Sequence, residues 1–263
     1  MRTASLSRRQ GKLMQRLDLL RELVIRDIQI LYKRSALGLA WTLINPLLQL
    51  AVFAFVFQLV LPVNVPKYSS FVFSGLLVWN WFQSSLFQAT GVITNNRALI
   101  RQPGFPAAIL PAVTVTTGLI HFTLALPILL VFMSIDGIEL KPIILAMPLL
   151  LALQFVLTVS LTYPLAAVNV TFRDTQHILG VILQLLFYLT PLFYDLKSVP
   201  ENLRLVYHLN PIVLLVESYR DILIQGVQPD WMALGILSAL SVVLLPIGHQ
   251  IFRRQSDRFV EEL

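Results

Sequence analysis

Two short polar segments between long apolar runs carry the charged residues best suited to bind a partner or an anion. The first, residues 95–111, reads NNRALIRQPGFPAAILP and contains Arg97 and Arg101 without an acidic residue. It also contains a cluster of helix-breaking residues, Pro103, Gly104 and Pro106. Because a helix cannot pass through such a cluster undistorted, we predict a short helix over residues 96–102 that is presented to a soluble partner. The alternative is a tight cytoplasmic loop held inside by its arginines.

The second polar segment, residues 171–177, reads TFRDTQH and places Arg173, Asp174 and His177 at the end of an apolar run. The planar guanidinium of arginine matches the oxygens of a phosphate, and a neighbouring aspartate can fix its rotamer. His177 follows Arg173 by four residues and shares its face if the turn is helical. We therefore predict a cytoplasmic gate that holds a lipid diphosphate. The alternative is a structural Arg173–Asp174 pair that faces the headgroups.

Enzymatic and metal chemistry find little support in the sequence. There are no cysteines, which excludes thiolate metal sites, disulfides and cysteine nucleophiles. The four histidines are scattered without metal-ligand spacing. Neither a phosphate-binding glycine loop nor a nucleophile elbow occurs. We expect no catalytic residue, no metal site and no cofactor held by this chain itself.

The composition shows what kind of element must position these charged segments. Of the 263 residues, 56% are hydrophobic and only 13% are charged. A soluble domain has about 25% charged residues, so lipid is the solvent for most of this chain. The long apolar runs predict an all-α integral membrane protein.

Six apolar runs are long enough to cross a hydrocarbon core of about 30 Å. They cover residues 36–61, 70–93, 107–135, 142–170, 178–194 and 230–252. Several contain internal prolines, which predicts kinked and tilted helices. We divide the chain into an N-terminal helix (residues 1–35), a transmembrane domain (36–252) and a charged cytoplasmic tail (253–263).

The N-terminal segment is expected to lie along the membrane surface. Its apolar residues recur at three- and four-residue steps, which is typical of an amphipathic interfacial helix. They are Leu13, Leu17, Leu20, Val24, Ile28 and Leu31. The segments on the side of both termini contain fifteen of the twenty Lys and Arg residues, and those on the other side contain five. This bias places both termini in the cytoplasm.

The outer segment, residues 195–229, is too polar for a single span and is expected to form two short re-entrant helices covered by protein or water. Aromatic residues gather in the second span and in the fifth span, including the last residue of the fifth. They could line a passage for sugar rings, which stack on aromatic faces, or they could be ordinary lipid-facing or interface residues. The candidates are Trp79, Trp81, Phe82, Phe187, Tyr188 and Tyr194.

The order of these motifs resembles a known family, the permease subunits of ABC-type polysaccharide exporters. The resemblance extends from about residue 20 to the C-terminus. It is carried by YKRSALGLAW followed by Asn45-Pro46, then NNRALIRQPGFP, FRDTQH, FYLTPLFY, a later NP with ESYRDILIQG, and the tail FRRQSDRFVEEL. The sequence departs from the family pattern after Arg101, where QPG stands in place of a bulkier, basic residue.

The resemblance implies a homodimer joined to two copies of a separate ATP-binding cassette ATPase, which would bind ATP and Mg²⁺. It implies a lipid-linked glycan of the O-antigen, capsule or teichoic acid type as the substrate, in a bacterial inner membrane, and no nucleic-acid partner. The ATPase would contact the N-terminal helix and a coupling set that consists of Asn96, Arg97, Leu99, Ile100, Arg101, Phe105 and Pro106. The outer gate would contain Asn210, Pro211, Glu217 and Arg220.

Two other classes of protein are compatible with parts of the sequence. A polytopic membrane enzyme acting on a polyprenyl-phosphate substrate would need acidic or histidine residues that converge at one membrane face, and Asp174 is a lone candidate. An ion-coupled secondary transporter would need ionisable residues in mid-membrane and usually has inverted repeats. The predicted spans contain almost no acidic residues, which disfavours the ion-coupled class.

Overall fold

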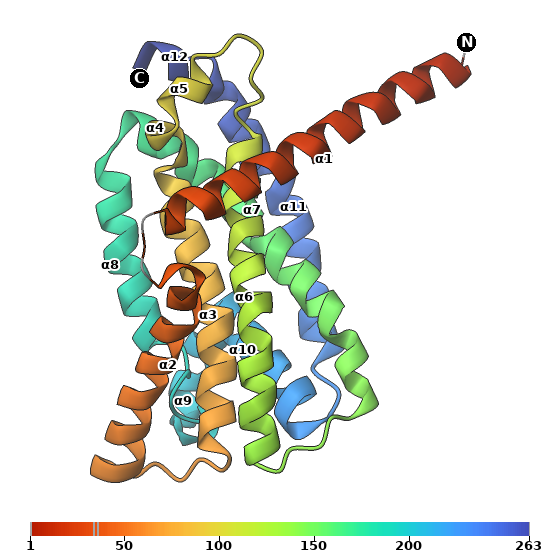
Figure 1. Ribbon diagram of the computed structural model, residues 1–263. Helices are drawn as coiled ribbons and strands as arrows, with labels where there is room; N and C mark the ends of the chain where they lie inside the picture. Colours follow the sequence, from red (N-terminus) through yellow and green to blue (C-terminus); the bar gives the residue numbers. More distant parts are fainter. Residues whose placement is uncertain (1, 34, 36, 263) are drawn as a thin grey trace.

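A computed structural model describes residues 2–33, 35 and 37–262, and helices with their connecting segments account for this part of the chain. The N-terminal helix α1, Arg2–Tyr32, crosses the helix bundle obliquely, and its N-terminal half projects beyond the bundle (Figure 1). Its apolar stripe is used in part: Leu20, Val24 and Ile28 pack onto the bundle, whereas Leu17 and Leu31 are exposed. The interfacial position of α1 stays a prediction.

The remaining elements follow one another with short connections. The first half contains η1 (Gly38–Ala40), α2 (Trp41–Ala54), the π-helical turn η2 (Phe55–Val60), α3 (Tyr68–Thr90), α4 (Val92–Asn95), α5 (Arg97–Ile100) and α6 (Ile109–Ile135). The second half contains η3 (Pro142–Ala146), α7 (Met147–Thr171), α8 (Asp174–Tyr188), η4 (Leu196–Ser198), α9 (Glu201–His208), α10 (Pro211–Arg220), η5 (Asp221–Gln225), α11 (Trp231–Ser256) and α12 (Phe259–Glu262). In Figure 1, α5 and α12 lie at one end of the bundle and α9 lies towards the other.

Four helical stretches of the described chain are long and apolar enough to cross a membrane. They are Gly38–Val60, Ile109–Ile135, Pro142–Thr171 and Trp231–Ser256. They correspond to four of the six predicted spans. The protein is therefore a multi-pass, all-helical membrane protein, and the remaining two spans stay a prediction.

The two other predicted spans differ from the expectation for local reasons. Helix α3 has 23 residues, but nine of them are Ser, Thr, Asn or Gln. It lies at the centre of the bundle, where neighbouring helices bury four of these polar residues, Ser70, Ser74, Ser85 and Thr90. Helix α8 has only 15 residues. It ends at Tyr188 instead of Tyr194 because Pro191 disfavours helical geometry at the preceding residue and lacks a backbone donor.

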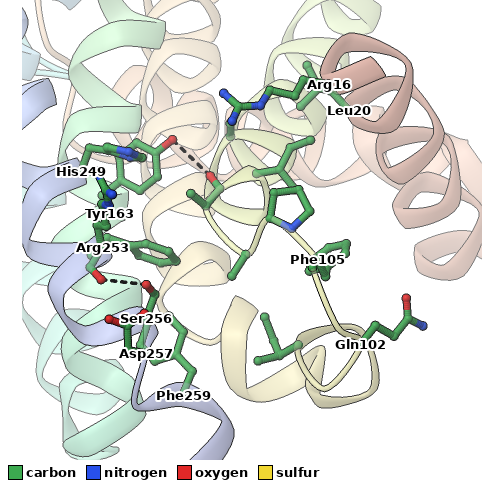
Figure 2. Close-up of a pocket in the computed structure, with 18 of the residues that line it drawn as sticks. Arg16, Leu20, Gln102, Phe105, Tyr163, His249, Arg253, Ser256, Asp257 and Phe259 are labelled. Atoms are coloured by element: carbon green, nitrogen blue, oxygen red, sulfur yellow. Dashed lines mark hydrogen bonds between the residues drawn. The ribbon is translucent and has the colours of Figure 1, made fainter. Parts of the chain in front are cut away.

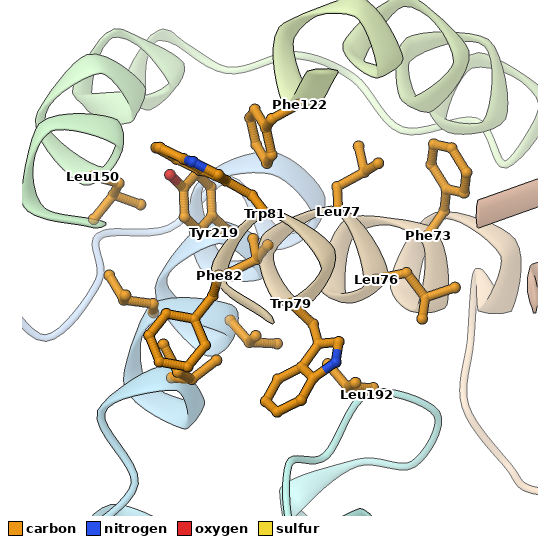
Figure 3. Packing of buried hydrophobic residues seen from close by; sticks show 14 of the residues in the cluster. Phe73, Leu76, Leu77, Trp79, Trp81, Phe82, Phe122, Leu150, Leu192 and Tyr219 are labelled. Carbon is orange, nitrogen blue, oxygen red and sulfur yellow. The ribbon is translucent and has the colours of Figure 1, made fainter. Parts of the chain in front are cut away.

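The helices pack around two apolar clusters. The larger one surrounds α3 and includes Phe73, Leu76, Trp79 and Trp81 (Figure 3). The smaller one lies at the end of the bundle where α1, α4 to α7, α11 and α12 meet, and Phe252 belongs to it. The smaller cluster thus fixes the elements that carry the predicted cytoplasmic segments.

Small residues let the long helices approach closely, as is common between membrane helices. A Cβ atom at Gly248 of α11 would lie 2.5 Å from the carbonyl oxygen of Ser160 on α7. A Cβ atom at Gly118 of α6 would lie 2.6 Å from the Trp81 ring of α3. These two glycines therefore set the spacing of the α7–α11 and α3–α6 pairs.

The outer segment forms two short helices, α9 and α10, as the sequence predicts. Asn210 caps α10, because its side-chain oxygen accepts a hydrogen bond from the amide of Ile212 at 3.1 Å. Most of α10 is buried against α3, α7 and α11. Whether this pair is re-entrant in the membrane stays a prediction.

Candidate functional site

The predicted coupling segment is held to the N-terminal helix by a polar corner. Asn96 separates α4 from α5, and its side-chain nitrogen donates to the carbonyl of Val92 at 2.9 Å. The Asn96 side-chain oxygen accepts a hydrogen bond from the Arg26 guanidinium of α1 at 3.0 Å. The same guanidinium forms an ion pair with Asp27 at 2.7 Å. Movement of α5 is therefore linked directly to α1.

The residues of the coupling set divide into two groups. Ile100, Arg101, Phe105 and Pro106 line a cleft of about 1110 Å³ (Figure 2). Asn96, Arg97 and Leu99 do not line it. Arg97 is exposed and donates to the carbonyl of Thr94 at 3.2 Å, whereas Leu99 packs against the smaller apolar cluster. The predicted helix over residues 96–102 is present in a shorter form, Arg97–Ile100, because Pro103 and Gly104 follow it.

The opposite wall of the cleft is built by residues that the sequence reading did not select. Tyr163 of α7 donates from its hydroxyl to the carbonyl of Ala108 at 3.1 Å, and both residues line the cleft. The ring of His249 packs edge-on against Tyr163 with centroids 5.1 Å apart. The C-terminal segment is a wall of this cleft, since Phe259 is buried against Phe252. In the sequence, the seven-residue spacing of Phe252 and Phe259 is the feature that could have indicated this contact.

The charges around the cleft are mostly basic. Arg16, Arg101 and Arg253 line it, and Asp257 is the acidic side chain among its described lining residues. Aromatic and aliphatic side chains, including those of Phe105 and Tyr163, line the rest of it (Figure 2). A partner surface that offers acidic residues beside an apolar contact would complement this cleft.

The predicted diphosphate gate lies at the start of α8. Arg173 occupies the N-cap position and Asp174 the first turn, where a negative charge complements the helix dipole. Arg173, Asp174 and His177 are all exposed, and the ion pairs of the described residues do not include an Arg173–Asp174 contact. The three side chains are free to meet a ligand at this end of the bundle.

The predicted aromatic lining is divided by the packing of α3. Trp79, Trp81 and Phe82 are 0%, 2% and 4% exposed, respectively. Trp81 points towards Phe122 of α6 and the indole nitrogen donates to the carbonyl of Val115, whereas Trp79 points the other way (Figure 3). These three rings hold helices together within the bundle, and a role in a passage stays a prediction for them.

The other three aromatic candidates lie together near the C-terminal end of α8. Phe187 packs edge-on against Trp79 and Tyr188, with centroids 5.7 and 5.4 Å apart. The hydroxyl of Tyr194 donates to the carbonyl of Tyr188 at 3.0 Å and lies 3.0 Å from the hydroxyl of Tyr207. Tyr188 is exposed and Phe187 and Tyr194 are half-buried, so a role in a passage stays a prediction for these three residues.

Arg220, a predicted outer-gate residue, is fully buried. Its guanidinium donates to the carbonyls of Phe71, Pro191 and Leu192 and forms an ion pair with Glu217 at 2.9 Å. It also lies 3.5 Å above the Phe71 ring. It therefore ties α10 to the start of α3 and to the segment after α8.

Beside this network, Asp221 is half-buried. Burial and the negative charge of Glu217 raise the pKa of Asp221 to about 6.

Comparison with known proteins places this fold in a transporter class. The family model for ABC-2 type transporters matches residues 18–224. The chain therefore belongs to the ABC-2 type transporter family, whose members are membrane proteins.

Individual relatives match over nearly their whole length. The O-antigen export system permease protein RfbA of Myxococcus xanthus is 39% identical over 254 residues, which cover 96% of this chain and 98% of the relative. A Klebsiella pneumoniae protein of the same name is 30% identical over 94% of this chain and 95% of its own length. The polysialic acid transport protein KpsM of Escherichia coli is 24% identical over 89% and 92% of the two chains.

Proposed function

We propose that this chain is the transmembrane subunit of an ATP-driven exporter that moves a lipid-linked polysaccharide across the bacterial inner membrane. Membership of the ABC-2 type transporter family supports a transport role. Relatives that align with nearly the whole chain are named for O-antigen export and for polysialic acid transport. O-antigen, capsule and teichoic acid type polymers are the substrates that fit this proposal.

The proposed assembly is a homodimer with two copies of an ATP-binding cassette ATPase. The sequence lacks a phosphate-binding glycine loop, so ATP and Mg²⁺ would bind to the partner. The cleft between α1, the segment after α5 and α11 is the surface proposed for the ATPase. Its basic and aromatic lining residues support this assignment.

The structure suggests how ATP hydrolysis would be coupled to transport. Helix α5 is joined to the central helix α3 through the short helix α4, and to α1 through the Arg26–Asn96 hydrogen bond. A displacement of α5 by the ATPase would therefore reach both the bundle centre and the surface helix. Conformational changes of this kind are carried by rigid elements that shift together.

The substrate would enter at the cytoplasmic face. Arg173, with Asp174 and His177 beside it, is proposed to hold the diphosphate between lipid and sugar, because a guanidinium keeps its charge when partly desolvated. Phe187, Tyr188 and Tyr194 near the C-terminal end of α8, together with the helix pair α9–α10, are proposed as parts of the exit.

The observation that carries the proposal is the basic cleft formed by the coupling segment, α1 and the C-terminal helices in an ABC-2 family chain. Deletion of the gene should remove the polymer from the cell surface, while lipid-linked polymer accumulates inside, and plasmid-borne wild type should restore export. Unchanged surface polymer would contradict the proposal. Modification of a polyprenyl-phosphate substrate by the purified chain alone would favour the membrane-enzyme alternative instead.

A further inference from the structure

A second cleft, of about 730 Å³, lies between α2, α3, α6 and the end of α1. It is distinct from the basic cleft beside the coupling segment and shares none of its described lining residues. Half of its lining consists of uncharged side chains that can donate or accept hydrogen bonds. They are Tyr32, Ser35, Thr42, Asn45, Gln49, Asn80, Gln83, Ser84, Gln88 and His121.

Hydrogen bonds between helices hold part of this lining in place. The hydroxyl of Tyr32, at the end of α1, lies 2.5 Å from the hydroxyl of Thr42 and 3.2 Å from Nε2 of His121. The side-chain nitrogen of Asn80 donates to the side-chain oxygen of Gln49 at 3.1 Å. This bond uses one donor of Asn80 and one acceptor of Gln49, so both amides keep further hydrogen-bonding capacity. The cleft therefore presents ordered polar groups.

A lipid chain is a poor occupant for such a surface. Polar groups that face hydrocarbon without partners are costly, and in membrane proteins they point to a bundle interior or a water-filled cavity. The chemical class that fits both the amides and the aromatic rings of the cleft is a carbohydrate, which combines hydroxyl groups with apolar ring faces. Trp41, Trp81, Phe87 and Phe122 line the same cleft, and its volume falls in the range of ligand pockets, about 300–1,000 Å³.

The charge of the lining indicates which kind of carbohydrate the cleft would bind. Among the described residues that line the cleft, Lys, Arg, Asp and Glu do not occur. A diphosphate or a strongly acidic polymer would find no described cationic partner there, whereas neutral sugar units need only amides and hydroxyls. We propose that this cleft binds uncharged sugar units of the exported glycan. This inference rests on the proposed export function and adds a binding site and a charge class to it.

The absence of cysteine from the chain permits a direct test with single-cysteine variants. Asn80→Cys and Gln88→Cys place the thiol in the cleft, and Val131→Cys on α6, 57% exposed and outside the cleft, is the matched control. Each variant, joined to its ATPase in nanodiscs, is treated with a cationic methanethiosulfonate reagent. Because the hydrated thiolate is the nucleophile that attacks the reagent and displaces its sulfinate, both cleft variants should react at least about tenfold faster than the control.

The exported polymer, extracted from the source cells as its lipid-linked form, is then added without ATP. At a concentration of twice its Kd it should slow the labelling of Asn80→Cys about threefold, and nanodiscs with the same lipids alone should not. Slow labelling of both cleft variants, fast labelling without protection, or equal protection by lipid alone would each overturn the inference. If compositional analysis finds an acidic sugar in every repeat of the polymer, the claim that the bound sugar units are uncharged is wrong.

Export by cells that carry each variant separates this inference from the proposed function. If Asn80→Cys cells export normally and the polymer gives no protection, the cleft assignment fails while the export function stands. If wild-type cells and deletion cells carry the same surface polymer, the export function itself fails.

Discussion

At the scale of single residues, Arg97 and Arg101 are equivalent in the sequence but not in the structure. Arg101 lines the basic cleft, and Arg97 is exposed outside it. Replacing Arg101 with Glu should weaken ATPase association by about 1 kcal/mol, roughly fivefold in affinity, with a matching loss of stimulated ATP hydrolysis. Arg97→Glu should have a smaller effect. The measurement is the titration of the purified ATPase against each variant in nanodiscs.

Lys67→Glu, an equal charge reversal in the predicted outer loop, is the control for general electrostatic effects. If Arg101→Glu binds the ATPase as tightly as wild type, the cleft is not the docking surface. If Arg97→Glu is the more damaging variant, the docking surface lies on the exposed side of α5.

The gate residues permit a test that separates ligand binding from a structural role. We predict that the swap Arg173→Asp with Asp174→Arg abolishes export with normal folding, because the cation moves to another azimuth of the helix. The swap puts a positive charge into the first turn of α8, which costs about 0.3–1 kcal/mol, too little to unfold the bundle. Surface polymer and detergent-solubilised yield are measured together.

The Arg173→Lys variant should export less polymer than wild type, since lysine lacks the planar guanidinium whose paired N–H groups match the oxygens of a phosphate. A swap variant that exports at the wild-type rate would show that Arg173 does not hold the diphosphate.

Asp221 makes stability depend on pH. Because its pKa in the folded protein is raised to about 6, above its ordinary value, the folded state binds more protons than the unfolded state between these two values. Stability from this group is present at low pH and is lost as the pH rises towards about 6. Asp221→Asn should therefore raise the apparent Tm at pH 7.5 by about 1–3 °C, a small shift because the side chain is only half-buried.

The gain should shrink when the same thermal unfolding is followed at pH 4, where wild-type Asp221 is protonated. An unchanged Tm difference across this pH range would show that Asp221 is not the responsible group.

At the scale of elements, Arg220 joins α10 to α3 and to the segment after α8. Arg220→Gln would leave the carbonyls of Phe71 and Pro191 without their donor and Glu217 without its cation. Loss of one partner of a buried ion pair costs about 3–5 kcal/mol, so we expect a large decrease in thermal stability in detergent. Arg220→Lys should lose less stability than Arg220→Gln, because lysine keeps the positive charge although it lacks the planar guanidinium.

Arg204→Gln is the matched control. Arg204 also donates to two carbonyls, those of Val199 and Lys197, but it is partly exposed and its ion pair with Glu201 is long, at 3.8 Å. Its replacement should cost about 1 kcal/mol or less. Equal losses for the two arginines would show that Arg220 is not a buried clamp.

At the scale of the whole molecule, the distribution of Lys and Arg predicts that both termini are cytoplasmic. Single cysteines at Lys67 and Gly137 should react with a membrane-impermeant thiol reagent in intact cells. Cysteines at Gly104 and Arg173 should react only after permeabilisation. Labelling of Gly104→Cys in intact cells would invert the orientation, and the ATPase could then not reach the cleft.

The sequence by itself determined the properties that depend on short stretches of chain. Four of the six predicted apolar runs correspond to helical stretches of membrane-spanning length in the structure. The cluster Pro103, Gly104 and Pro106 predicts that the coupling helix is short, because backbone geometry at Pro and Gly is a local property. The two short helices of residues 195–229 also follow from local motifs. The order of the motifs indicates the family, and the match to the ABC-2 type transporter model confirms it.

Only the tertiary structure decided which residues meet across the bundle. It separated Arg101 from Arg97, buried Trp79 and Trp81 on opposite sides of α3, and brought the C-terminal segment with Phe259 to the basic cleft. Hydrophobicity along the chain does not distinguish a side chain that faces lipid from one that faces another helix, because both environments are apolar. The polar cleft beside Asn80 likewise exists only because four distant segments place uncharged polar groups around one space.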